Sequence, residues 1–201
     1  MNLFLDFDGT LLDSRKRLHH LFSFLVPTSA LSFADYWKLK RAGIGHKEIL
    51  QKQFSYSHDA INNFQQQWYH LIEQPEWIKY DTALPGVTEK LIELKEKYAL
   101  CLVTARQYHT VVQQQLEELN WTGLFKYVLV TAQQKEKQIL IAENVSVTTA
   151  DWFIGDTGKD VQTGKLLNIK TAAVLSGFLN REKLLKYEPD MIIESITNFN
   201  L

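Results

Sequence analysis

Two aspartates close to the start of the sequence carry its clearest chemical signal. Asp6 and Asp8 lie in the run LFLDFDGT at positions 3–10, directly after a short apolar segment. Side chains two residues apart leave an extended strand on the same side, so we expect the two carboxylates to lie close together. Without a counter-charge they would repel each other, and one would be forced to keep its proton. A hard divalent cation relieves this repulsion and prefers oxygen ligands, so the pair indicates a metal site rather than an acidic surface turn.

A threonine marks the end of a second apolar run, at positions 99–103. Thr104 is followed by Ala105 and Arg106. A hydroxyl at a buried strand end, followed by free backbone N–H groups, offers hydrogen bonds to a group the size of a phosphate. The alternative is a threonine that only ends the strand. The motif therefore indicates a phosphate site only in combination with the others.

A pair of lysines precedes an expected helix at positions 138–143. Lys135 or Lys137 could supply a fixed positive charge to phosphoryl oxygens. We favour Lys135, because Lys137 lies closer to the first apolar residues of the helix. The local pattern leaves Lys137 as the alternative, and a solvated helix start would explain the segment without any site.

Two more aspartates follow the apolar run at positions 152–154. That run leads through Gly155 into Asp156, and Asp160 comes four residues later. Asp156 is placed to be a third carboxylate on the metal. Asp160, about one helical turn further on, can orient Asp156 or hold a metal-bound water. The alternative is an aspartate that caps the start of a helix.

The elements that must position these residues follow from the apolar pattern. Short apolar runs alternate with longer amphipathic stretches, which predicts buried parallel strands separated by helices. We expect strands at positions 2–6, 99–103, 127–130, 152–154, 171–175 and 191–193. Ligands of such sheets bind beyond the carboxyl ends of the strands, where the residues above are placed. The predicted fold class is α/β, with three α/β/α layers around a mostly parallel, Rossmann-like sheet.

The pattern changes between about positions 12 and 81. Apolar residues there recur near helical spacing, as in Ile61, Phe64, Trp68 and Leu71, without a comparable strand run. We expect about four helices, inserted after the first strand. The predicted domains are a catalytic core at positions 1–12 and 82–201 and a helical domain at positions 13–81.

Composition limits the classes of partner and compartment. The 201 residues include 22 basic and 23 acidic ones, and this balance gives no support for a nucleic-acid or membrane partner. The single cysteine, Cys101, cannot form an internal disulfide, and its apolar neighbours predict a buried side chain. No stretch approaches the ~18 apolar residues of a membrane helix. The opening residues lack the basic leader and long apolar stretch of a secretion signal, so we expect a cytoplasmic protein.

Together, these motifs resemble the haloacid dehalogenase-like hydrolase superfamily. The run DFDGTLLDS at positions 6–14 and the phrase LPGV at positions 84–87 carry the resemblance most specifically. The second phrase is typical of the phosphoglycolate phosphatase-like and β-phosphoglucomutase-like branch, and the helical insert is similar to the small cap domain of that branch. The resemblance covers nearly the whole chain.

The resemblance implies roles for the aspartates. Asp6 would attack the phosphorus of a phosphate monoester and form an aspartyl-phosphate. Asp8 would protonate the leaving oxygen and then take a proton from the hydrolytic water. Mg²⁺ would be held by the Asp6 carboxylate, the Asp8 backbone carbonyl and Asp156, with Asp160 in support.

The resemblance also implies how the substrate is bound. Thr104, the Ala105 N–H and Lys135 would hold the phosphoryl oxygens. Arg106 follows this motif directly and is a candidate for contact with the substrate. The combination of Ala105 and Arg106 departs from the pattern of many relatives, which leaves recognition of the leaving group open.

We therefore expect a magnesium-dependent phosphatase that acts on a small phosphorylated metabolite, as a monomer or homodimer. Asp8 speaks against the dehalogenase members, which lack an acid/base aspartate at that position. A phosphonatase would need a desolvated cap lysine, and the sequence marks none of Lys38, Lys40 and Lys47 as such. The main alternative is a phosphosugar mutase of the β-phosphoglucomutase type. A non-catalytic binding or regulatory module is disfavoured, because it would not need an acid/base aspartate.

Overall fold

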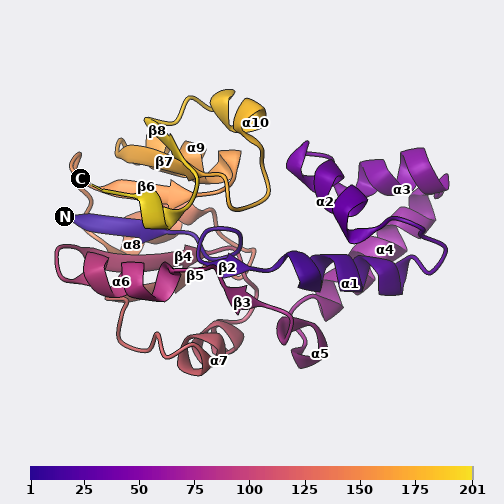
Figure 1. The fold of residues 1–201 in the computed structure, drawn as a ribbon, viewed down its shortest axis with the longest axis horizontal. Helices are drawn as coiled ribbons and strands as arrows, with labels where there is room; N and C mark the ends of the chain where they lie inside the picture. The colour runs from indigo at the N-terminus through magenta and orange to yellow at the C-terminus, as the bar shows by residue number, and fades with distance from the viewer. Residues whose placement is uncertain (201) are drawn as a thin grey trace. The chain divides into compact units, whose positions relative to one another are not determined.

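The computed structural model describes residues 1–200, which form two compact units (Figure 1). One unit comprises Met1–Asp13 and the chain from Ala83 onward, and the other comprises Ser14–Thr82. The two connecting segments, β2 (Leu12–Asp13) and β3 (Thr82–Ala83), pair as a two-stranded sheet. Among the described residues, no helix has both the length and the apolar character needed to cross a membrane.

A parallel sheet forms the centre of the first unit. In the described part of the chain it has six strands, in the order β5-β4-β1-β6-β7-β8, and every neighbouring pair is parallel. The strands are β1 (Asn2–Leu5), β4 (Ala99–Thr104), β5 (Tyr127–Val130), β6 (Trp152–Gly155), β7 (Lys170–Val174) and β8 (Met191–Ile193). In β1, Leu5 lies opposite Leu102 on one side and Ile154 on the other. The predicted parallel α/β sheet is confirmed.

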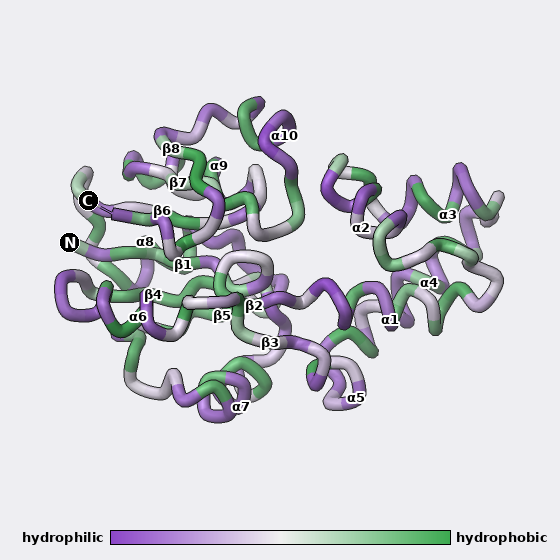
Figure 2. Tube along the Cα trace, in the orientation of Figure 1, coloured by the Kyte–Doolittle hydropathy of each residue, from purple (hydrophilic) through white to green (hydrophobic). Residues whose placement is uncertain are grey.

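Helices cover both faces of this sheet, because alternate strand residues point to opposite sides. They are α6 (Val87–Lys95), α7 (His109–Glu118), α8 (Lys137–Asn144), α9 (Gly158–Leu166), α10 (Arg181–Leu185) and the 3₁₀ turn η1 (Ile196–Asn198). Leu5 packs in one cluster with Leu91 of α6 and Leu116 of α7. Phe4 points the other way and packs in a second cluster with Ile141 of α8. Figure 2 shows the hydrophobic residues running along the central strands, as a three-layer fold requires.

The second unit is helical. In residues 14–82 it contains α1 (Arg15–Leu25), α2 (Phe33–Arg41), α3 (His46–Phe54), α4 (His58–Leu71) and the short α5 (Pro75–Ile78). Serine hydroxyls cap two of the helix starts: Ser32 accepts from the Asp35 N–H and Ser57 from the Ala60 N–H. The interior of this unit is aromatic, and Phe22 lies against Tyr36 and Phe64.

A buried ion pair joins the two ends of the helical unit. Arg17, near the start of α1, lies with its Nε 3.0 Å from Oδ1 of Asp81, just before β3. The Arg17 guanidinium also donates to the Ile72 carbonyl. Because both charged side chains are almost fully buried, loss of one partner would leave an uncompensated charge in the interior.

Candidate active site

Three carboxylates meet at the carboxyl edge of the sheet. Asp6 directly follows β1 and its N–H donates to the Ile154 carbonyl of β6, which fixes it beside the end of that strand. Asp156 follows β6, and Asp160 lies in the first turn of α9. Oxygen atoms of Asp6, Asp156 and Asp160 lie within 4.8 Å of one another, and all three residues are buried. The sheet thus brings together three aspartates that are up to 154 positions apart in the sequence, from position 6 to position 160.

Burial and mutual repulsion dominate the electrostatics of this cluster. Burial raises the pKa of Asp6 to about 7, although the nearby Lys137 acts in the opposite direction. Burial, together with the charges of Asp6 and Asp160, raises the pKa of Asp156 well above its usual value. The Asp156 Oδ2 accepts from the Phe178 N–H at 2.5 Å, whereas Oδ1 is buried and has no hydrogen-bond partner among the described residues. A buried, unsatisfied carboxylate oxygen among like charges is what a hard divalent cation would satisfy, so this donor set fits Mg²⁺.

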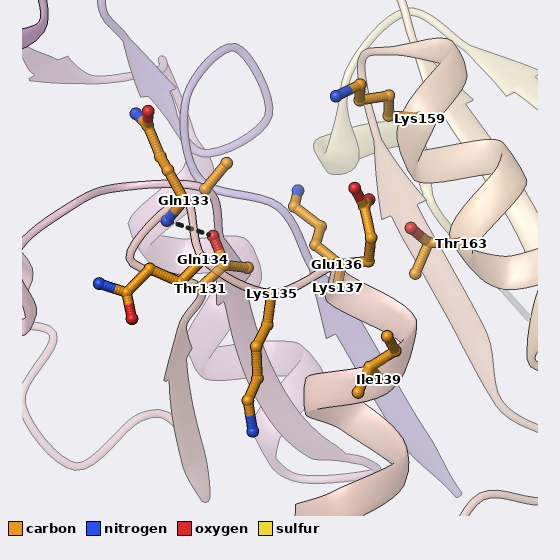
Figure 3. Close-up of a pocket in the computed structure, with 10 residues that line it drawn as sticks. Thr131, Gln133, Gln134, Lys135, Glu136, Lys137, Ile139, Lys159 and Thr163 are labelled. Carbon is orange, nitrogen blue, oxygen red and sulfur yellow. Dashed lines mark hydrogen bonds between the residues drawn. The ribbon is translucent and has the colours of Figure 1, made fainter.

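Lys137 is the lysine that enters the cluster, which corrects the preference for Lys135. The Lys137 Nζ lies 2.5 Å from Asp6 Oδ1 and 2.7 Å from Asp160 Oδ1. The Lys135 Nζ lies 2.6 Å from Glu143 Oε2, and the Lys135 side chain is half-exposed. Figure 3 shows the two lysine side chains leaving this segment in opposite directions.

The phase of α8 explains why Lys137 points inward. The helix begins at Lys137, and Ile141, four residues later, is fully buried against the sheet. Residues four apart share a helix face, so Lys137 lies on the buried side, and proximity to apolar residues favours its position rather than excluding it. Burial lowers the pKa of Lys137, but the carboxylates of Asp160 and Asp6 outweigh this and raise it, so the ammonium stays charged.

Asp160 is held by protein groups at both oxygens. Its Oδ2 accepts from the N–H and the hydroxyl of Thr157. The Thr157 hydroxyl in turn accepts from the Asp160 N–H, which completes a capping box at the start of α9. Its Oδ1 accepts from Lys137 at 2.7 Å. The structure therefore places Asp160 so that it fixes the lysine, in addition to facing the other two carboxylates.

Asp8 and Arg106 form a close pair. The Arg106 Nε lies 2.5 Å from Asp8 Oδ2, and Nη2 lies 2.7 Å from Oδ1. The Arg106 side chain is 4% exposed and that of Asp8 is 20% exposed. The sequence predicted contact between Arg106 and the substrate, and in the structure its guanidinium contacts Asp8. Thr104 is buried at the end of β4, and its Oγ1 accepts from the Arg106 N–H at 3.3 Å.

Two glycines let the surrounding loops approach Asp156 closely. Gly9 has a φ of +83°, and a Cβ at Gly9 or at Gly177 would overlap the Asp156 carboxylate. Gly177 and Phe178, which follow β7, were missed by the sequence analysis. The signal that could have identified them is their position after the next predicted strand of the same sheet edge.

A cavity of about 670 Å³ adjoins the cluster. Ala105 and Lys137 line it on the side of the predicted phosphate site, and Gln133, Glu136 and Lys159 line other parts (Figure 3). Because Lys137 lines this cavity and also binds Asp6, a small molecule in the cavity would lie next to the carboxylate cluster.

Comparison with known proteins identifies the family of the chain. A model of the haloacid dehalogenase-like hydrolase family matches residues 3–174. The chain therefore belongs to that family, and the expectation of a hydrolase of this superfamily is confirmed.

Individual relatives match over almost the full length. The chain is 24% identical over 200 residues to a phosphoglycolate phosphatase of Aquifex aeolicus, a match that covers 94% of this chain and 89% of the relative. It is 26% identical over 203 residues to the pyrophosphatase PpaX of Oceanobacillus iheyensis, covering 95% and 91%. A haloacid dehalogenase-like hydrolase from Streptococcus pneumoniae has the same fold, with a TM-score of 0.73, 22% identity and coverage of 98% and 94%.

Proposed function

We propose that this chain is a magnesium-dependent phosphatase that hydrolyses a small phosphate monoester. The observation that carries the proposal is the buried cluster of Asp6, Asp156 and Asp160 with the Lys137 ammonium bonded to Asp6. Family membership supports the hydrolase class, and the names of the two relatives support phosphate compounds as substrates. The natural substrate is a small phosphorylated metabolite in this proposal.

The metal would be held by carboxylates that already face one another. We assign the Asp6 carboxylate, the Asp156 Oδ1 and the Asp8 backbone carbonyl as its ligands, with Asp160 in support. When bound, Mg²⁺ would neutralise these anions and so allow a phosphate group to approach the Asp6 carboxylate.

The side chains divide the chemistry between them. Asp6 attacks the phosphorus, the bond to the leaving oxygen breaks, and Asp8 gives that oxygen a proton. Asp8 then takes a proton from the water that attacks the aspartyl-phosphate, which releases inorganic phosphate and restores Asp6. Thr104, the Ala105 N–H and Lys137 hold the phosphoryl oxygens throughout. Lys137 takes the role that the sequence assigned to Lys135.

Further properties of the chain remain predictions. We propose that the helical unit acts as the substrate-selecting cap, with the predicted domain limits at positions 13 and 81. We also propose a cytoplasmic enzyme that works as a monomer or homodimer. A mutase of the β-phosphoglucomutase type is the competing assignment, and it must suppress hydrolysis of the aspartyl-phosphate.

Phosphate release over a panel of phosphorylated metabolites tests the proposal. The panel includes phosphoglycolate, pyrophosphate and hexose phosphates, each with Mg²⁺ and with a chelator. We expect steady, Mg²⁺-dependent release of inorganic phosphate, which Asp156→Asn reduces strongly. Asp151→Asn is the matched control, because Asp151 is equally buried but binds the Asn2 and Thr148 N–H groups at the other end of β6. Isomerisation of a hexose phosphate without net release would support the mutase instead.

A further inference from the structure

Arg106 and Asp8 form a bidentate ion pair. Nε and Nη2 of the guanidinium reach the two different oxygens of the Asp8 carboxylate, at 2.5 Å and 2.7 Å. A planar fork of this kind fixes the plane of the carboxylate as well as its distance, which a single hydrogen bond does not. The orientation of the Asp8 side chain is therefore tied to that of Arg106.

Arg106 is itself held on several sides. Its backbone N–H donates to the Thr104 hydroxyl at 3.3 Å, and its guanidinium carbon lies 5.6 Å from the centre of the Phe7 ring. Phe7 is fully buried, and Arg106 is 4% exposed. A buried side chain with this support has few alternative rotamers, whereas the Asp8 side chain remains one-fifth exposed.

We propose that Arg106 is a positioning residue, which holds the Asp8 carboxylate in the orientation for proton transfer, and not a ligand of the substrate. The inference rests on the proposed function, because it concerns the acid/base role of Asp8. Two of the three guanidinium nitrogens face the Asp8 carboxylate, and because only 4% of the Arg106 side chain is exposed, little of it is open to a ligand.

The dependence of the rate on the leaving group distinguishes the two roles. Propyl phosphate has a poor leaving group that needs a proton, whereas p-nitrophenyl phosphate releases a stable anion that does not. Neither leaving group carries a charge in the substrate, so neither needs an arginine for recognition. The value of kcat/KM covers the steps up to departure of the leaving group, and it therefore reports proton donation by Asp8.

We expect Arg106→Met to lower kcat/KM for propyl phosphate by about 100-fold and for p-nitrophenyl phosphate by only about threefold. Asp8→Asn should show the same selectivity, and the double variant should be no worse than Asp8→Asn alone, since the two residues act as one unit. Arg106→Lys keeps a cation at the buried position without the planar fork, so it should fall between the wild type and Arg106→Met.

Lys90→Met is the matched control for loss of a buried cation. Lys90 is 6% exposed and binds Glu93 and Asn200 away from the site. It should lower the thermal unfolding temperature without changing the ratio of the two kcat/KM values. The same unfolding measurement on Arg106→Met and Arg106→Lys confirms that the variants compared are folded.

Three results would overturn the inference while leaving the proposed function intact. They are an equal loss of kcat/KM for both esters in the Arg106 variants, a loss for both esters that appears only in KM, and an additive loss in the double variant. Wild-type protein that released phosphate from neither ester would instead overturn the proposed function, and this inference with it.

Discussion

At the carboxyl edge of the sheet, a cluster of three buried carboxylates includes two that bind Lys137, whereas in the helical unit Tyr36 is buried and His46 and Lys40 are partly buried. In the first group the Asp6 and Asp160 carboxylates raise the pKa of Lys137, despite its burial. In the second, burial alone lowers the pKa of Lys40 to about 8. The two regions show that burial of an ionisable group has opposite consequences, depending on whether a counter-charge is buried with it.

The helical cluster favours neutral forms. The Tyr36 hydroxyl and the His46 Nε2 lie 2.7 Å apart, and the His46 ring lies 4.2 Å from the Trp68 ring, between their centres. Burial raises the pKa of Tyr36, and burial followed by the charge of Lys40 lowers the pKa of His46 well below its usual value. Packing of neutral rings stabilises this unit, whereas the carboxylate cluster is retained at a cost in stability that the proposed chemistry explains. The sequence marks no lysine of the helical insert as desolvated, whereas partial burial lowers the pKa of Lys40 in the structure.

The largest expected effect is at Asp6. Asp6→Asn should lower turnover by more than about 1,000-fold, because the amide is a poor nucleophile. The protein should stay folded, because the substitution removes a buried negative charge that lies among other carboxylates. Phosphate release measures the loss of turnover, and circular dichroism measures whether the variant stays folded. Mg²⁺-dependent activity that survived in this variant would remove Asp6 as the nucleophile.

The next largest expected effect on kcat/KM separates Lys137, the first residue of α8, from Lys135 just before it. Lys137→Met should reduce kcat/KM by about 100-fold or more, because the buried cation beside Asp6 is lost. Lys135→Met is the matched control, and it should remain within about twofold of wild type because its surface pair with Glu143 contributes little. The reverse order of effects would restore the assignment of Lys135.

In the helical unit, His46 should make stability depend on pH. Its folded pKa lies below the unfolded value of 6.5, so below pH 6.5 the unfolded chain binds a proton that the folded chain does not. The free energy of unfolding then falls as the pH decreases, by at most about 1.4 kcal/mol per pH unit. Hydrogen exchange of the α3 and α4 amides, corrected for intrinsic exchange rates, measures this slope.

Two variants separate His46 from the other histidines. His46→Gln cannot titrate and should flatten the slope, at some cost in packing. His58→Gln, at an exposed position of α4, should leave the slope unchanged. An equal slope in wild type and His46→Gln would show that other groups control the acid sensitivity.

The smallest expected effect is at Lys40. At pH 7 this side chain is charged in both states, and burial penalises only the folded one, since its folded pKa of about 8 lies below the usual 10.5. Lys40→Met should therefore raise the stability of the helical unit by roughly 1 kcal/mol. Lys38→Met, at an exposed position of the same helix, should change it little. Destabilisation by Lys40→Met would mean that a favourable contact offsets the burial.

The sequence by itself determined the layer architecture and the places where chemistry gathers. Apolar runs that are buried on both faces must form central parallel strands, and the side chains that follow them must meet at one edge. For this reason the sequence alone predicts that Asp6 and Asp156 lie together. The segment after β7 was not recognised, because Gly177 and Phe178 act through backbone contacts that have no side-chain signature.

Only the tertiary structure decided which side chains meet. The choice between Lys135 and Lys137 depended on the residue at which α8 begins, and a shift of two positions turns a side chain from the sheet toward solvent. The contact of Arg106 with Asp8 joins positions 98 residues apart, and no local pattern determines such a contact. Spacing along the chain fixes which residues reach the same edge, whereas helix phase and rotamers, set by packing, fix which of them touch.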